Sequence, residues 1–195
     1  MQGILILLSG PSGSGKGSLV AHVRDTYPEF FQPLSWTTRA ARSGEKDGTS
    51  TSGKRYRFVS KEQFEKAIEQ NAFLEWAQFS NNYYGTPAQE VQDALAEGRV
   101  VFQELEIQGV EQLLTRISRQ QIKMIFVNVQ SWEDLQKRIL GRQTISDTEL
   151  QLRHERYEQE LLFKEKADFV LENVYGKFEQ TKNNLDSIIQ RILQK

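Results

Sequence analysis

The sequence predicts an α/β fold in which helices flank a parallel sheet, with a small α+β lobe and a helical lid inserted into the alternation of strands and helices. Three observations predict it. Short, continuously apolar segments alternate with longer segments of helical periodicity, as in βαβ units whose strands are buried on both faces. A glycine-rich turn joins the first apolar segment to the first helical one. Two stretches, 35–86 and 141–157, break the alternation.

The strands and helices of the main unit follow from this pattern. Dense Val, Ile, Leu and Phe predict buried strands over Ile4–Leu8, Val100–Leu105, Lys123–Val129 and Asp168–Leu171. Helices are expected over Lys16–Thr26, Ala88–Glu97, Ile107–Ser118 and Trp132–Arg142. A last helix is indicated by apolar residues at helical spacing, namely Phe178, Leu185, Ile188, Ile189 and Ile192.

Several helix starts are recognisable. Ser60, Ser131 and Ser146 each precede an acidic residue or glutamine by three positions, as in a capping box. Thr86 followed by proline predicts an N-cap residue before the first helical position. Glu160, four residues before a lysine, has the spacing that stabilises an exposed helix face.

The two interrupting stretches differ in character. Residues 35–86 predict short strands, Arg55–Val59 and Phe73–Phe79, around one helix, Lys61–Gln70, and thus a small substrate-binding lobe. Residues 141–157 are polar and charge-rich, with almost nothing to bury, and predict a mobile flap.

Composition limits the classes of function. The 195 residues carry 25 Lys and Arg against 26 Asp and Glu, a formal net charge of -1, so no basic excess points to nucleic acid. The absence of cysteine excludes a disulfide framework, thiol catalysis and cysteine-ligated metals, and it fits the cytoplasm. The first eight residues hold only a five-residue apolar run, so neither a signal peptide nor a membrane span is expected. A monomer and a homo-oligomer both remain compatible with the sequence.

The glycine-rich turn after the first strand has the spacing G-x-x-x-x-G-K, which between a strand and a helix is the phosphate-binding loop of P-loop NTPases. Its residues are Gly10, Pro11, Ser12, Gly13, Ser14, Gly15, Lys16 and Gly17. Backbone N–H groups and the helix N-terminus attract an anion, and the lysine reaches the β- and γ-phosphates. Gly17 stands where a hydroxyl residue usually binds Mg²⁺. The ion is therefore expected to be held through water and a carboxylate, or imperfectly by Ser18.

Further motifs lie in a fixed order after this loop. They are S-x-T-T-R-x-x-R-x-G-E from Ser35, F-L-E-W around Glu75, N-Y-Y-G-T ending at Thr86, and E-L-E-I-Q-G at 104–109. In their order and spacing they resemble the guanylate kinase family over essentially the whole chain. The resemblance implies a phosphoryl transfer from ATP to GMP, and to dGMP, in purine nucleotide metabolism and GMP recycling. It also implies a core of residues 1–34, 87–137 and 158–195, a GMP-binding lobe of residues 35–86 and a lid of residues 138–157.

The chemistry of guanine fits these residues. One carboxylate can accept both N1–H and N2–H of guanine, and Glu75 is the candidate, with hydroxyls offered near the base by Ser35 and Thr86. Adenine lacks this donor pair and would leave a buried carboxylate unpaired, which can discriminate on the order of 10⁴-fold. The resemblance adds Glu106 at the guanine edge.

The GMP phosphate needs cations. Arg39 and Arg42, three residues apart, can bind it as a fork. The resemblance adds the hydroxyls of Tyr56 and Tyr84 to this cradle.

Phosphoryl transfer depends on positioning and charge stabilisation more than on covalent chemistry. The resemblance implies that the charge developing on the phosphates is stabilised by Lys16, by Mg²⁺ and by three lid arginines, Arg138, Arg142 and Arg153. It places Glu104 where it orients Mg²⁺ through water, and Asn173 against the adenine of ATP.

Two alternatives stay open. A non-catalytic guanylate-kinase-like interaction domain generally lacks the loop lysine or the lid arginines, all of which this chain keeps. A related P-loop kinase acting on a sugar phosphate should lack the guanine-reading residues, which are also present.

Overall fold

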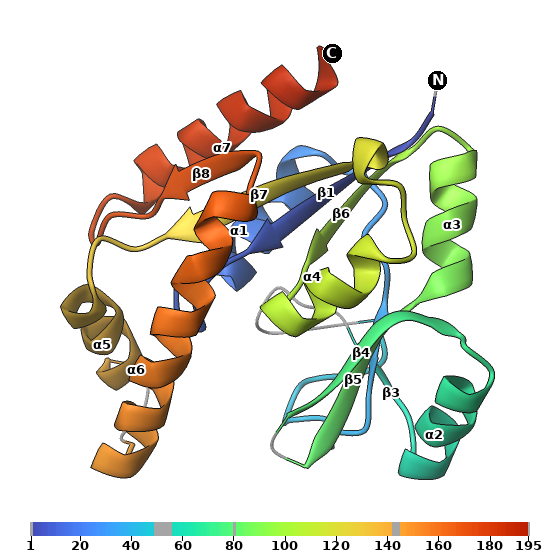
Figure 1. The fold of residues 1–195 in the computed structure, drawn as a ribbon, viewed down its shortest axis with the longest axis horizontal. Coiled ribbons are helices and arrows are strands. Elements are labelled where there is room, and N and C mark those ends of the chain that lie inside the picture. The colour runs from blue at the N-terminus through green and yellow to red at the C-terminus, as the bar shows by residue number, and fades with distance from the viewer. Residues whose placement is uncertain (1, 49–55, 80, 142–144, 195) are drawn as a thin grey trace.

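The computed structural model describes residues 2–48, 56–79, 81–141 and 145–194, and its elements form two sheets with flanking helices (Figure 1). The first sheet is entirely parallel and has the order β6-β1-β7-β8. Its strands are β1 (Ile4–Ser9), β6 (Val100–Glu104), β7 (Ile122–Asn128) and β8 (Phe169–Glu172). The predicted fold class is therefore confirmed, and each of the four predicted strands is present within one or two residues of its expected ends.

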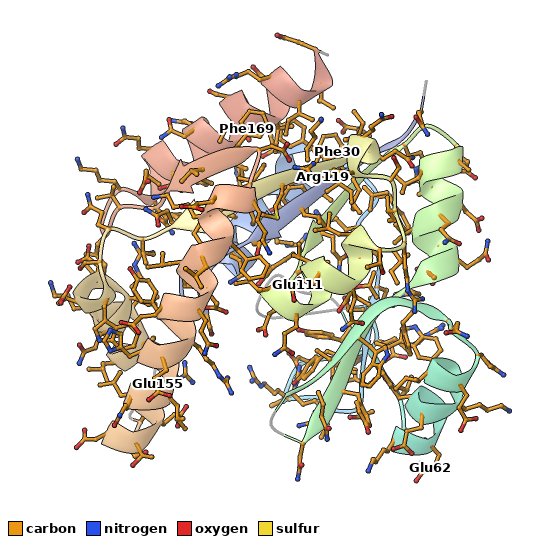
Figure 2. All side chains as sticks on the ribbon, viewed as in Figure 1. Phe30, Glu62, Glu111, Arg119, Glu155 and Phe169 are labelled. Carbon is orange, nitrogen blue, oxygen red and sulfur yellow. The ribbon has the colours of Figure 1, made fainter. Side chains whose placement is uncertain are left out.

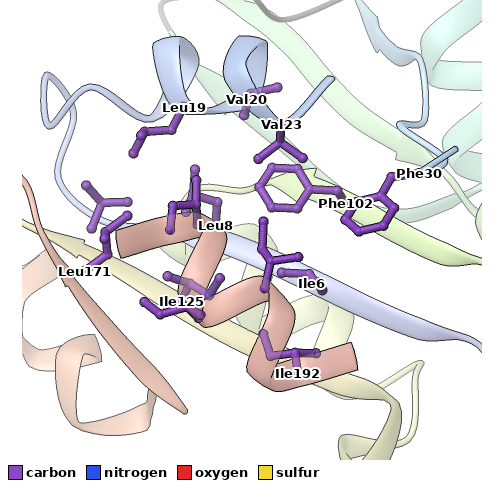
Figure 3. Packing of buried hydrophobic residues seen from close by; sticks show 14 residues of the cluster. Ile6, Leu8, Leu19, Val20, Val23, Phe30, Phe102, Ile125, Leu171 and Ile192 are labelled. Carbon is purple, nitrogen blue, oxygen red and sulfur yellow. The ribbon is translucent and has the colours of Figure 1, made fainter. Parts of the chain in front are cut away.

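Helices cover both faces of this sheet because successive strand residues point to opposite sides. Ile6 and Leu8 of β1 pack with α1 (Lys16–Thr26) and α7 (Phe178–Leu193), as Figure 3 shows. Leu5 and Leu7 pack on the other side. The helices there are α3 (Ala88–Ala96) and α4 (Ile107–Leu114).

The second sheet belongs to the inserted lobe and has the order β3-β2-β5-β4. Its strands are β2 (Ser35–Thr37), β3 (Tyr56–Phe58), β4 (Phe73–Phe79) and β5 (Asn82–Pro87). The helix α2 (Lys61–Glu69) contributes Phe64, which stacks on Phe73 and Tyr83 in a small aromatic core. The lobe thus has a hydrophobic centre of its own.

We refer to α5 (Trp132–Leu140) and α6 (Asp147–Leu161) as the lid helices. They extend from the first sheet on the side opposite the lobe in the view of Figure 1. As expected, the described part of residues 141–157 buries little: Tyr157 is the one buried residue there, 8% exposed, and it packs against Leu135 and Ile139. This one aromatic residue packs α6 against α5. The helix also continues past the expected lid boundary at residue 157.

The helix caps are largely as predicted. Ser60 forms a complete capping box, and Ser131 and Ser146 each accept a hydrogen bond from a backbone N–H three residues later. The N-cap prediction for Thr86 is wrong: Pro87 is the N-cap of α3, and Thr86 lies within β5 with its hydroxyl bonded to a carboxylate.

Acidic side chains are exposed on the lobe and on the lid helices. Glu62 on α2 and Glu155 on α6 are both exposed there (Figure 2). Two short 3₁₀ helices, Arg119–Gln121 and Leu162–Lys166, complete the elements. Among the described residues, no helix combines the length and the apolar character that crossing a bilayer requires.

Candidate functional site

The phosphate loop lies between β1 and α1 and depends on left-handed glycines. Gly10, Gly13 and Gly15 have φ values of 139°, 96° and 92°. A Cβ atom on Gly10 would lie 2.5 Å from the backbone oxygen of Val127, and one on Gly15 would lie 2.7 Å from the side-chain amide of Asn173. The loop can therefore pack against its neighbours only with glycine at these positions.

Lys16 is held inside this loop. Its ammonium donates to the backbone oxygens of Gly10, at 2.7 Å, and Pro11, at 3.0 Å, and lies 4.0 Å from a carboxylate oxygen of Glu104. The residue is 5% exposed. The structure thus brings together two of the predicted residues, Lys16 and Glu104, at the carboxyl ends of β1 and β6.

Glu160, which the sequence predicts only as part of an exposed ion pair, also contacts the loop. The backbone N–H of Ser12 donates to a carboxylate oxygen of Glu160, at 3.2 Å. Burial raises the pKa of Glu160, although Lys16 and the hydrogen bond from Ser12 act in the opposite direction. The predicted pairing partner, Lys164, lies instead 3.9 Å from Glu172. The signal available in the sequence was the position of Glu160 three residues after Tyr157, on the same helix face.

A cavity lies between the second sheet and the end of β6. Its lining includes six of the predicted residues: Ser35, Tyr56, Glu75, Tyr84, Glu104 and Glu106. Gly109 of α4 also lines it, and a Cβ atom there would lie 2.7 Å from a carboxylate oxygen of Glu75. The glycine leaves room for the carboxylate, and the lining brings together strands from both sheets.

Glu75 belongs to a buried hydrogen-bond chain. The hydroxyl of Thr86 donates to one carboxylate oxygen of Glu75, at 2.5 Å, and the amide of Gln103 donates to the Thr86 hydroxyl, at 2.9 Å. The same amide lies 3.4 Å from the hydroxyl of Ser35. Glu75, Thr86 and Gln103 are 7%, 1% and 6% exposed. Gln103 is absent from the predicted site residues, because a glutamine inside an apolar run reads only as part of a strand.

The two predicted phosphate-binding arginines meet at Glu45. A guanidinium nitrogen of Arg39 lies 2.9 Å from a carboxylate oxygen of Glu45, and the backbone N–H of Arg42 donates to the same oxygen at 2.9 Å. These two hydrogen bonds hold the pKa of Glu45 below its usual range. Arg39 lies over the ring of Tyr56, with 5.6 Å to its centroid, whereas Arg42 is exposed. Glu45 thus fixes the segment that carries both arginines.

A second cavity lies behind the phosphate loop. Gly15, Ser18, Arg138, Asn173 and Tyr175 are among its lining residues. Arg138 donates to the backbone oxygens of Asn173 and Ser14, and its guanidinium lies 5.8 Å from the ring centroid of Tyr175. This cavity brings α5 and the segment after β8 to the start of α1.

Asn173 anchors the loop. Its side-chain amide donates to the backbone oxygen of Ser14, at 2.7 Å, and accepts from the hydroxyl of Thr181, at 3.2 Å. The residue is 3% exposed. A chain of hydrogen bonds therefore connects α7 through Asn173 to the phosphate loop.

Of the other two predicted lid arginines the structure describes Arg153 alone, and it does not bring this residue to the loop. Arg142 lies outside the described residues. Arg153 donates to the carboxylate of Glu149, one turn earlier on α6, at 2.7 Å. Seven residues of helix, about 10 Å, separate it from Glu160, which contacts the loop.

The structure shows no preformed metal centre in the part of the chain that it describes: no three Asp, Glu or His side chains gather there in a way that could hold an ion. The hydroxyls of Ser9, at the end of β1, and of Ser14, within the loop, are buried without a hydrogen-bond partner among the described residues. Glu104 is the carboxylate that lies against Lys16.

Comparison with known proteins gives a consistent result. A family model described as "Guanylate kinase" matches residues 2–192. The chain is 42% identical over 167 residues to a guanylate kinase of Synechococcus sp. (strain CC9311), covering 86% of this chain and 84% of the relative. It is 38% identical to a guanylate kinase of Rubrobacter xylanophilus, covering 98% and 96%. The crystal structure of guanylate kinase from Anaplasma phagocytophilum superposes with a TM-score of 0.72 at 25% identity, covering 100% of this chain and 88% of that one.

Proposed function

The chain belongs to the guanylate kinase family, and on that premise we propose how its residues share the transfer of the γ-phosphoryl group of ATP to GMP. The enzyme is an ATP:GMP phosphotransferase, a nucleoside monophosphate kinase. The observation that carries the assignment of residues is the buried carboxylate of Glu75, which lines a cavity and is oriented by Thr86.

Glu75 accepts N1–H and N2–H of guanine in this proposal. The Thr86 hydroxyl supports this role because it takes one carboxylate oxygen and thereby fixes the plane of the carboxylate. Ser35 and Glu106, which line the same cavity, complete the recognition of the base. Adenine in this cavity would leave the buried carboxylate without its donors, and that loss is the basis of selectivity.

Arg39, Arg42, Tyr56 and Tyr84 bind the phosphate of GMP. Arg39 is supported by its contact with Glu45 and its position over Tyr56, which lines the GMP cavity. The exposed Arg42 shares the same loop and reaches the phosphate when GMP binds. Together the two cations hold the attacking phosphate oxygen in line with ATP.

In this proposal ATP binds at the phosphate loop, on the side away from the GMP cavity. The backbone of Gly10 to Gly17 and the hydroxyl of Ser18 surround its phosphates, and Lys16 exchanges its bonds to the loop carbonyls for bonds to phosphate oxygens. Arg138 and Asn173, which line the cavity behind the loop, place the adenine end.

The transfer itself needs stabilisation of the charge that develops between donor and acceptor. Lys16 and Arg138 are close to the loop, and Arg142 and Arg153 join them when the lid helices close over ATP. Closure would break the bond between Arg153 and Glu149 and would exclude water from the transfer.

Magnesium fits this site as an ion held mainly by phosphate oxygens and water, since Mg²⁺ takes oxygen ligands and keeps several waters. Glu104 is the carboxylate that would hold it through water, and Gly17 offers no hydroxyl. When bound, the ion neutralises phosphate charge. We place the enzyme in the cytoplasm and in purine nucleotide metabolism, with dGMP as a second acceptor and with neither nucleic acid nor membrane as a partner.

The test is a coupled assay of ADP release with GMP, AMP, CMP and UMP as acceptors. Turnover with GMP should exceed turnover with the other three by several orders of magnitude. No activity with GMP, or equal activity with all four, would overturn the proposal. Binding of GMP without turnover would instead favour the non-catalytic interaction domain.

A further inference from the structure

Gln103 is a buried polar residue at the junction of the two sheets. It lies on β6 of the first sheet, after the apolar residues 100–102, and its side chain lines the cavity of the inserted lobe. Burying a side-chain amide is unfavourable unless the amide is hydrogen-bonded. Its amide group is bonded to Thr86 at 2.9 Å and lies 3.4 Å from the hydroxyl of Ser35. The residue thus connects two hydroxyls that the proposed function places beside guanine.

The orientation of this amide follows from the proton that Thr86 donates. The Thr86 hydroxyl donates to a carboxylate oxygen of Glu75, at 2.5 Å. A carboxylate only accepts, so the Thr86 proton points at Glu75 and the Thr86 oxygen is left to accept. The Gln103 atom facing it must therefore be the amide NH₂ and not the carbonyl oxygen.

The second proton of that NH₂ group has consequences for Ser35. It points toward the Ser35 hydroxyl oxygen, which accepts it. The Ser35 proton is then directed away from Gln103, and Ser35 acts as a donor in the cavity that both residues line. The cavity consequently presents an acceptor at Glu75 and a donor at Ser35.

This pattern complements guanine, which has donors at N1 and N2 beside an acceptor at O6. Adenine offers the reverse at these positions, an acceptor at N1 and a donor at N6. We propose that Gln103 is a specificity-determining positioning residue: its amide, itself oriented by Thr86, selects guanine by fixing the direction of the Ser35 hydroxyl proton. The inference rests on the proposed function, because it requires that the base of GMP binds in the Glu75 cavity.

The test removes both donors while keeping the size of the side chain. Gln103→Leu should raise KM for GMP about tenfold and lower the preference for GMP over AMP by about the same factor, because the Ser35 hydroxyl loses its fixed direction and the Thr86 oxygen loses its donor. KM for ATP should stay unchanged. Gln103→Met serves as a second variant of similar volume if the leucine variant fails to fold. Gln78→Leu is the matched control, since Gln78 is exposed on β4 and lies outside the cavity lining.

An atom-specific readout separates proton direction from general loosening of the cavity. In 6-thio-GMP a sulfur, which is a weaker hydrogen-bond acceptor, replaces O6. The wild-type enzyme should prefer GMP to 6-thio-GMP, and this preference should shrink toward unity in Gln103→Leu, because Ser35 no longer directs a proton at that atom. A generally loosened cavity would instead weaken the binding of GMP and of 6-thio-GMP by the same factor.

The outcomes are distinguishable from failure of the proposed function. Wild-type enzyme that does not select GMP would overturn that function and with it this inference. If the wild type selects GMP, unchanged KM and unchanged preferences in both Gln103 variants would overturn the inference alone. An equal rise in KM for ATP and GMP would overturn it as well, because it would indicate a purely structural role.

Discussion

The carboxylate of Glu160 accepts a hydrogen bond from the backbone N–H of Ser12, at 3.2 Å, so a negative charge from a lid helix contacts the phosphate loop. Loop N–H groups are the groups that bind phosphate oxygens in such loops. ATP and Glu160 therefore compete for the same donor, and ATP binding has to move the carboxylate or protonate it.

Removing this charge should strengthen ATP binding. In Glu160→Gln the repulsion between a carboxylate and the ATP phosphates is gone, so Kd for ATP should fall about fivefold, equivalent to about 1 kcal/mol. Isothermal titration with a non-hydrolysable ATP analogue measures this. Glu158→Gln, an exposed change on the same helix, is the control. Unchanged or weaker binding would contradict the competition.

The pKa of Glu160 predicts a pH dependence of stability. Burial raises this pKa in the folded protein, so the folded state holds the proton more tightly than the unfolded state. The contribution is fully present below the ordinary glutamate pKa, about 4.3, and is lost as pH rises through the raised value. Relative to Glu160→Gln, the wild type should therefore lose Tm between pH 4 and pH 8. A difference in Tm that stays constant over this range would rule the linkage out.

Lys16→Met should abolish turnover while the fold remains. The Lys16 ammonium donates hydrogen bonds to the backbone oxygens of Gly10 and Pro11, and water can take over these bonds in the variant. Water cannot replace the positive charge that stabilises the phosphoryl transfer. We expect kcat to fall at least a hundredfold, with an unchanged circular dichroism spectrum. Lys61→Met, an exposed change on α2, is the control. Near-normal turnover would remove this lysine from the mechanism.

Glu45→Gln should impair the binding of GMP and spare that of ATP. Glu45 holds both Arg39 and the backbone of Arg42, and an amide forms weaker bonds to a guanidinium than a carboxylate does. KM for GMP should rise about tenfold at constant KM for ATP, measured by ADP release. Glu69→Gln, exposed at the end of α2, should change neither constant. Equal effects on both substrates would argue against a role in placing Arg39.

Gly17→Ser should lower the Mg²⁺ concentration needed for half-maximal activity. The substitution supplies a hydroxyl at the position after the loop lysine, where Mg²⁺ would gain an oxygen ligand. A Mg²⁺ titration of both proteins at saturating ATP and GMP measures the shift. The same midpoint in both would show that this position does not contact the ion.

The framework of the molecule could be predicted from the sequence because its signals are local. The run Ile4–Leu8 is apolar at every position, since alternate residues face helices on opposite sides of the sheet. The phosphate loop could be recognised from the G-x-x-x-x-G-K spacing between a strand and a helix, and the left-handed φ values explain why glycines stand there.

What escaped prediction depends on contacts between distant segments. Glu160 has the spacing of an exposed ion pair, and only the packing of α6 beside the loop brings it to Ser12. Gln103 is informative only when β6 meets the second sheet at Thr86. Thr86 has the local features of an N-cap, but a buried carboxylate across the strand pair takes its hydroxyl.

The chain of hydrogen bonds from Thr181 through Asn173 to Ser14 has a consequence for synthesis on the ribosome. Asn173 and Ser14 are 159 positions apart, so the phosphate loop is translated early and its anchor very late. The two strands that pair with β1, namely β6 and β7, are also translated long after the loop. A nascent chain therefore carries the complete nucleotide-binding motif for most of its elongation without the support that holds it in shape. We therefore expect the loop to reach its ATP-binding shape only after α7 has formed.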